Sequence, residues 1–269
     1  MTMRMKLCRW TMAAAAVGMA LGVAAKAQSS EPACSMGVGS ASGYGPWGRV
    51  AYTATAKTTF EQRLPDGNIV GGFMRTHLAR DGAGKWMSEM GQRCVRDENG
   101  EPRAQLYVSV FDPAMKTTMN WNVGTDDMPK VVKVFHASTT PRKPLTPEEL
   151  AAQRKAAERQ QPPRNEYKTE DLGSKIIAGV EVHGSRTTRT IPPGEEGNQL
   201  QLVTTNEIWR SNKLGLVMMT VSDDPRHGKT TYEIEELDQN EPNPAVFAPP
   251  EGYKIEDHPA DVITASTAQ

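Results

Sequence analysis

The sequence predicts a mostly β fold, an antiparallel meander with one polar helix and a proline-rich C-terminal tail. Short segments with apolar residues at every second position recur along the chain, and turn residues separate them. Helical patterns do not alternate with these segments, which favours antiparallel hairpins over parallel crossover units. The third observation is a stretch near the C-terminus that consists of three such segments in succession.

This stretch, at residues 200–237, carries the strongest strand pattern. Its segments are LQLVTTNEIWR, LGLVMMTVS and KTTYEIEEL, and residues 211–213 and 223–228 supply the turns between them. The middle segment, residues 214–222, is apolar at both parities, which is typical of a strand covered on both sides. We therefore expect the rest of the sheet to be added to this centre.

The remaining strands are bounded by turn residues. Asp66-Gly67, Asp81-Gly82 and Asn99-Gly100 separate hairpins, and Asp112-Pro113 ends a fourth strand. The expected strands lie at residues 50–61, 69–80, 85–95, 103–111, 116–123 and 176–191.

One polar helix interrupts the strands at residues 146–161. Thr146-Pro147-Glu148-Glu149 is a capping box with proline at the first helical position. Only Leu145 and Leu150 are large apolar side chains, and so thin an apolar stripe does not bind a groove strongly. We expect a solvated connector, and the alternative is a mobile flap or a partner-binding arm.

The N-terminus predicts export. Arg4, Lys6 and Arg9 precede a small, apolar run, and Ala25-Lys26-Ala27 is typical of a cleavage site. The run is shorter than the roughly 20 apolar residues that a membrane anchor requires. We therefore expect cleavage after Ala27 and a periplasmic or secreted product with no transmembrane segment in its mature chain.

The predicted domain organisation begins with this signal peptide. Residues 1–27 are the predicted signal peptide and residues 28–48 an irregular segment rich in glycine and serine. Residues 49–256 form the predicted β domain with the helix inserted, and residues 257–269 a frayed tail. Phe247 and Tyr253 are candidate anchors of the proline-rich end.

Two cysteines remain in the mature chain, Cys34 and Cys94, because Cys8 leaves with the signal. In an oxidising compartment a single pair predicts a disulfide. The alternative, a redox pair, lacks the C-x-x-C spacing that lowers a thiol pKa.

Composition and motifs argue against several functions. The formal net charge of -1 gives no electrostatic reason to expect nucleic acid as a partner. The five histidines show no metal-ligand spacing, so we expect neither a metal nor a cofactor. The sequence has no G-x-S-x-G, S-x-x-K, H-E-x-x-H or P-loop motif, so we assign no catalytic residue and expect no enzyme. Residues 223–228 are interpreted as a turn, with acid–base chemistry as the alternative.

The turns and the end of the chain carry a resemblance. The D-G-N and D-G-A-G turns at residues 66–68 and 81–84, the Asp112-Pro113 break and the phrase NPAVFAPPEGY at residues 243–253 are its motifs. In these the chain resembles the LolA-like superfamily of periplasmic lipoprotein carriers and outer-membrane lipoprotein-sorting proteins. Its second half, from residue 172 onward, is also similar to exported bacterial proteins of unassigned function.

The resemblance implies a single strongly curved antiparallel sheet, a half-barrel, that binds an apolar ligand on its concave face. A lipid, an acyl chain or a lipidated protein would be the ligand, and the alternative is an envelope protein-interaction or sensing module without a small-molecule ligand. The candidate lining residues are Leu106, Val108, Met119, Trp121, Leu216 and Met218.

Overall fold

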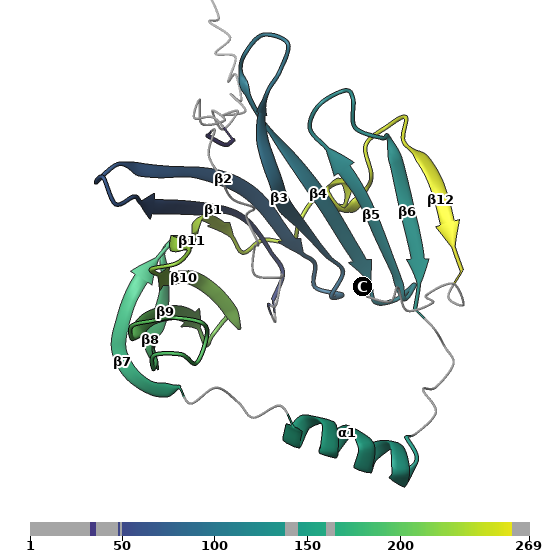
Figure 1. The fold of residues 1–269 in the computed structure, drawn as a ribbon. Helices are drawn as coiled ribbons and strands as arrows, with labels where there is room; N and C mark the ends of the chain where they lie inside the picture. The colour runs from purple at the N-terminus through teal and green to yellow at the C-terminus, as the bar shows by residue number, and fades with distance from the viewer. Residues whose placement is uncertain (1–32, 36–47, 49, 138–144, 160–164, 260–269) are drawn as a thin grey trace, which may run out of the picture. The chain divides into compact units, whose positions relative to one another are not determined.

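The computed structural model describes residues 33–35, 48, 50–137, 145–159 and 165–259. The predicted signal peptide at residues 1–27 lies outside them. Within the described residues the chain forms one open, curved sheet and a single α-helix, so the predicted fold class is confirmed (Figure 1).

The sheet consists of two meanders. The first six strands are β1 (Tyr52–Arg63), β2 (Ile69–Arg80), β3 (Trp86–Arg96), β4 (Pro102–Asp112), β5 (Thr117–Val123) and β6 (Val131–His136). The next five are β7 (Glu166–Ile177), β8 (Val180–Ile191), β9 (Leu202–Ser211), β10 (Leu216–Asp224) and β11 (Gly228–Asp238). Strand β11 returns to pair with β1, which joins the two meanders. The described strand order is β12-β6-β5-β4-β3-β2-β1-β11-β10-β9-β8-β7.

The three strands predicted at residues 200–237 are β9, β10 and β11, which are neighbours and antiparallel as expected. They do not lie at the centre of the sheet, where β1 lies between β2 and β11. The two parities of β10 also differ, since Leu216 and Met218 are buried whereas Val217 and Met219 are only half-buried. Sequence alternation does not reveal this position, because it depends on which distant strand β11 meets.

The C-terminal tail adds a strand that the sequence pattern did not predict. Lys254–His258 forms β12, which pairs in parallel with β6 and makes the sheet mixed. Its sequence has no apolar alternation, so the pairing depends on how the tail is anchored. Phe247, in the 3-10 helix η1 (Pro244–Phe247), is buried, and the Tyr253 hydroxyl donates to the Asn122 carbonyl at 2.9 Å. Both predicted anchors therefore hold the tail, and the predicted end of the domain at residue 256 falls inside β12.

Two main hydrophobic clusters hold the sheet. The first, called here the large cluster, joins strands β1, β2 and β7–β11. Its buried members are Tyr52, Ala54, Ala56, Leu78, Ile177, Val180, Val182, Trp209, Leu214, Leu216, Met218, Tyr232 and Ile234. The second, the tail cluster, lies beneath η1. Its buried members are Ala79, Met87, Val108, Val110, Trp121, Val132 and Phe247.

The sheet splits between β2 and β3. Only Leu78–Arg80 pair with Trp86–Ser88, although both strands continue well beyond this point. At the end of the pairing the His77 amide donates to Glu89 Oε2 at 2.8 Å, and the same carboxylate lies 2.7 Å from His77 Nδ1. This contact raises the pKa of His77.

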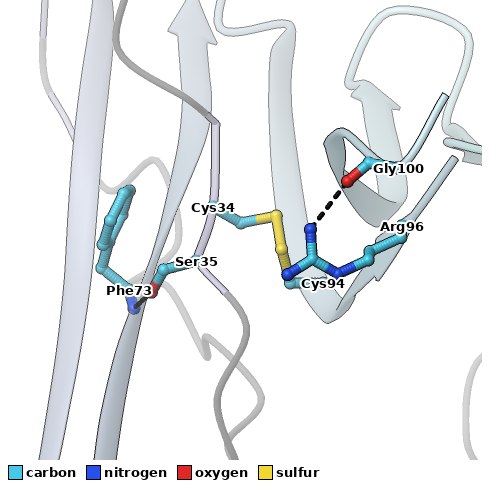
Figure 2. Close-up of a disulfide and its surroundings, with 6 residues drawn as sticks. All are labelled: Cys34, Ser35, Phe73, Cys94, Arg96 and Gly100. Carbon is cyan, nitrogen blue, oxygen red and sulfur yellow. Dashed lines mark hydrogen bonds between the residues drawn. A yellow bond between two sulfur atoms is a disulfide. The ribbon is translucent and has the colours of Figure 1, made fainter.

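The N-terminal segment fills the split on the β2 side. Cys34 pairs with Met74 as an isolated antiparallel bridge, flanked by hydrogen bonds from the Ser35 and Arg75 amides. The Phe73 amide donates to Ser35 Oγ at 2.9 Å (Figure 2). The disulfide between Cys34 and Cys94 of β3 is present, which confirms the predicted pairing. It ties the two diverging strands together through this inserted segment.

The helix α1 (Pro147–Arg159) begins at the predicted capping box. The Glu149 amide donates to Thr146 Oγ1 at 3.2 Å, and the Thr146 amide donates to Glu149 Oε2 at 2.7 Å. Every side chain described in α1 is exposed. Among the described residues no helix is both long enough and apolar enough to cross a membrane.

Candidate ligand-binding surface

A row of side chains crosses seven strands in register. It consists of Tyr52, Arg80, Trp86, Phe111, Thr118, Phe135 and His258, one each from β1, β2, β3, β4, β5, β6 and β12. Side chains of register partners leave the same face of a sheet. The part from β3 to β12, called the aromatic row, therefore presents Trp86, Phe111, Phe135 and His258 on one face, with Thr118 between them.

The aromatic row lies on the face opposite the tail cluster. Met87, Val110 and Met119 are register partners on β3, β4 and β5, each one residue from a member of the row, and they pack into the tail cluster. Successive residues of a strand point to opposite faces. The segment that contains Phe247 therefore covers one face of β3–β6 and leaves the aromatic row on the other.

The aromatic side chains are half-buried and outside the hydrophobic clusters of the described residues. Trp86, Phe111 and Phe135 belong to none of them. Two ring contacts lie within the row. The ring centroids of Trp86 and Phe111 are 5.8 Å apart, and Phe135 stacks on His258 at 5.1 Å. Among the described atoms, His258 Nε2 is buried without a hydrogen-bond partner.

Ion pairs fix the strands beside the row. Lys85 Nζ lies 2.7 Å from Asp112 Oδ2, next in sequence to Trp86 and Phe111. This hydrogen bond lowers the pKa of Asp112. His136 Nε2 lies 2.6 Å from Asp257 Oδ1, next in sequence to Phe135 and His258. The register of the four aromatic side chains is thus held from both ends of the row.

Polar residues follow the row along the strands. The next register series is Ser88, Ser109, Asn120 and Lys133, and beyond it lie Met90, Tyr107 and Asn122. Burial raises the pKa of the Tyr107 hydroxyl. The surface is therefore an apolar band bordered by hydroxyls and amides, which combines apolar contact area with a few polar groups that can orient a ligand.

The six residues predicted from the sequence to line a cavity lie in three different clusters. Val108, Met119 and Trp121 meet in the tail cluster, Leu216 and Met218 meet in the large cluster, and Leu106 packs beside Cys34 and Met74. Val108 and Trp121 are each 4% exposed, and Met218 is fully buried. Whether any of the six contacts a ligand stays a prediction. The sequence reasoning missed Trp86, Phe111 and Phe135, although Trp86 and Phe111 occur beside predicted turns.

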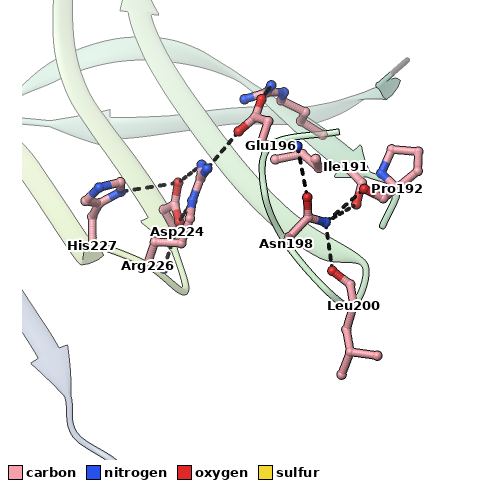
Figure 3. A network of polar contacts seen from close by, with 9 residues as sticks. Ile191, Pro192, Glu196, Asn198, Leu200, Asp224, Arg226 and His227 are labelled. Carbon is pink, nitrogen blue, oxygen red and sulfur yellow. Dashed lines mark hydrogen bonds and ion pairs between the residues drawn. The ribbon is translucent and has the colours of Figure 1, made fainter. Parts of the chain in front are cut away.

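The polar cluster at residues 223–228 has the geometry of a turn. The Arg226 amide donates to Asp224 Oδ1 at 2.9 Å, and the Arg226 guanidinium also binds the other carboxylate oxygen and Glu196 Oε2, each at 2.7 Å (Figure 3). The hydrogen bond from Arg226 lowers the pKa of Asp224 to about 2. His227 Nδ1 is 3.6 Å from Asp224. The Asp224 carboxylate is thus bound by arginine, and among the described residues no group of three metal-ligating side chains occurs.

No family model matches this sequence, and no curated protein matches it. Similar solved structures include an uncharacterized conserved protein from Thermus thermophilus, with 7% identity and a TM-score of 0.37 over 78% of this chain and 91% of that one. A beta-barrel-like protein of the domain of unknown function DUF1849 from Brucella abortus has 12% identity and a TM-score of 0.28 over 71% of this chain and 98% of that one.

MucB, solved in complex with MucA(peri), has 9% identity and a TM-score of 0.29 over 75% of this chain. The chain covers 54% of that MucB chain. At these TM-scores the likenesses say nothing about a site or a ligand. The lipoprotein-carrier superfamily is not named in these matches, so that resemblance stays a prediction.

Proposed function

We propose that this chain is an exported, non-enzymatic protein that binds an apolar ligand, a lipid acyl chain or a lipidated protein, across the aromatic row of its curved sheet. The supporting observation is the presence of half-buried Trp86, Phe111 and Phe135, in register, on the face that the tail does not cover. A solvated sheet face carries polar side chains at such positions. Aromatic pairs at such positions are typical of a binding surface.

The dimensions of the row suit an extended chain. Neighbouring strands lie about 4.8 Å apart, so the four steps from β3 to β12 span roughly 19 Å, comparable to a long acyl chain. Completing the burial of three half-buried aromatic side chains would contribute about 2–4 kcal/mol, and each methylene removed from water about 0.8 kcal/mol. Together these terms are sufficient for binding after the entropy cost of ordering the chain.

The test compares two faces of the sheet. Phe111→Ser and Phe135→Ser change the aromatic row, while Phe73→Ser removes an equally half-buried ring that contacts Lys57 and Arg75 instead. The protein is purified from a periplasm, its lipid extract is analysed by mass spectrometry, and binding of a fluorescent fatty acid is measured. We expect a stoichiometric lipid in the wild type and in Phe73→Ser, and at least tenfold weaker binding in the two row variants.

An extract without lipid from folded protein, or equal losses in all three variants, would refute the assignment. The intact mass of the same preparation also tests export, since cleavage after Ala27 leaves a chain that begins at Gln28.

The second candidate function is an envelope protein-interaction module. It is favoured by the exposure of α1, in which Leu150 is 44% exposed. Deletion of residues 146–161 separates the two functions. If the deletion variant no longer captures a partner protein but binds the fatty acid unchanged, the interaction module is favoured. If capture of partner proteins is unchanged, α1 is excluded as the interface.

A further inference from the structure

A pocket lies at the ends of strands β7, β8 and β9, on no part of the aromatic row. Its volume is about 480 Å³, within the range of small-molecule sites. Its polar lining includes Ser174, His183, Arg210, Asn212, Lys213 and Gln239.

The apolar part of the lining belongs to the packed interior. Val180, Val182 and Leu214 are 8%, 1% and 2% exposed, and all three are members of the large cluster. Side chains in a close-packed core have little freedom to move. These residues therefore anchor the strand ends and the turn that line the pocket, so its polar groups are carried by a rigid support.

Basic side chains from separate elements line this pocket. His183 on β8 and Arg210 on β9 are register partners, so their side chains leave the same face with Cβ atoms about 5 Å apart. Lys213 comes from the following turn, which buried Ser211 holds in place. The Leu214 amide donates to Ser211 Oγ at 3.4 Å, and the Gly215 amide donates to the Ser211 carbonyl at 2.8 Å.

Two cations of this pocket have no partner within the described part of the chain. Arg210 and Lys213 have no ion pair or hydrogen bond to another described residue. In contrast, Arg186 on β8 donates a hydrogen bond of 2.9 Å to Glu207 on β9. Glu181 is the one carboxylate among the lining residues, and Asp171 lies 3.1 Å from His183 Nε2. An arginine and a lysine without carboxylate partners, held close together, attract an anion.

We propose that this pocket binds the phosphate group of a phosphate ester. The Arg210 guanidinium donates two parallel hydrogen bonds to phosphate oxygens, and Lys213 adds a point charge. His183 keeps Nδ1 for the ligand while Asp171 holds Nε2. The Asn212 and Gln239 amides and the Ser174 hydroxyl are further donors within the same lining.

The experiment titrates the full exported chain with inorganic phosphate and with glycerol 3-phosphate in a calorimeter, and sediments it with vesicles of phosphatidylglycerol or phosphatidylcholine. Saturable binding to the soluble phosphates supports a free ligand. Sedimentation with phosphatidylglycerol alone supports a lipid headgroup as the source of the same chemistry. In either case Arg210→Gln should weaken binding roughly tenfold or more, because a charge-assisted hydrogen bond is lost.

Arg186→Gln is the matched control, since it removes the same charge from the same strand pair and should leave binding unchanged. Binding should also weaken with rising salt. Absence of saturable binding to all four probes would overturn the proposal, as would an equal loss in the two variants. If Arg210→Gln fails to fold by circular dichroism, Lys213→Gln carries the same test.

Discussion

Breaking the disulfide should lower the free energy of unfolding by about 4 kcal/mol. The double variant Cys34→Ser, Cys94→Ser opens a loop of sequence separation 60, which contains β1 and β2. The entropy lost by closing a loop of this length in the unfolded chain is about 14 cal/mol/K, equivalent to roughly 4 kcal/mol at 25 °C. Changing both cysteines avoids leaving one reactive thiol in a buried position.

Urea denaturation followed by circular dichroism measures the change. With a slope of roughly 2–3 kcal/mol per molar urea, the midpoint should fall by roughly 1.3–2 M. Reduced wild type should unfold at the same midpoint as the double variant, which serves as the control for the two serines. A midpoint that shifts by less than about 0.3 M would refute the loop-closure argument.

Hydrogen exchange gives a local readout of the same change. The Arg75 amide donates to the Ala33 carbonyl at 2.7 Å, and the Phe73 amide donates to Ser35 Oγ. Both hydrogen bonds depend on the inserted segment, so both amides should exchange faster in the double variant. The exchange rates of the amides that pair β1 with β2 should change less, since that pairing runs along the full length of both strands.

Two further predictions concern turns. Asp224→Asn should reduce the loss of stability on acidification between about pH 4 and pH 2. The Arg226 hydrogen bond lowers the pKa of Asp224 to about 2, so the stabilisation by this carboxylate is present above the unfolded pKa and is lost as the pH falls through the folded pKa. An acid titration followed by fluorescence that is the same in both proteins would contradict this. Gly228→Ala should lower the free energy of unfolding, measured in urea, by about 2 kcal/mol or more, because φ is +81° and the new Cβ would lie 2.3 Å from the Glu61 carbonyl oxygen. Gly252→Ala is the control: φ is +79° but the Cβ would meet open space, so the loss should be about 1 kcal/mol. Equal losses in the two variants would exclude the clash.

Local sequence signals predicted the parts of the fold that depend on neighbouring residues. Strand alternation and turn residues located the hairpins of β1–β5 and of β9–β11, and the capping box at Thr146 marked the start of α1. Strands β6 and β7 were not predicted, and the single strand expected at residues 176–191 is the end of β7, a turn and β8. The disulfide was also predictable, because cleavage of the predicted signal peptide would leave Cys34 with a single candidate partner. Each of these inferences needs only a short window of sequence or a count.

Features that depend on distant pairing were not predictable in this way. The polar sequence of β12 becomes a strand only because Phe247 and Tyr253 place its backbone beside β6, where unpaired backbone groups can accept it. The aromatic row has the same origin. Trp86 and Phe111 are separated by the lengths of two strands, and only the register of the sheet brings their side chains onto one face.

The tail covers one face of β3–β6. Both faces carry large apolar side chains, Val108 and Trp121 on one and Trp86 and Phe111 on the other, so alternation alone does not identify a binding face. Phe247 packs with Val108 and Trp121, so a ligand that binds at these two residues requires the tail to move. Binding that persists after substitution of Trp121 but is lost after substitution of Phe111 would therefore indicate a ligand on the aromatic row, whereas the reverse would indicate a ligand beneath the tail.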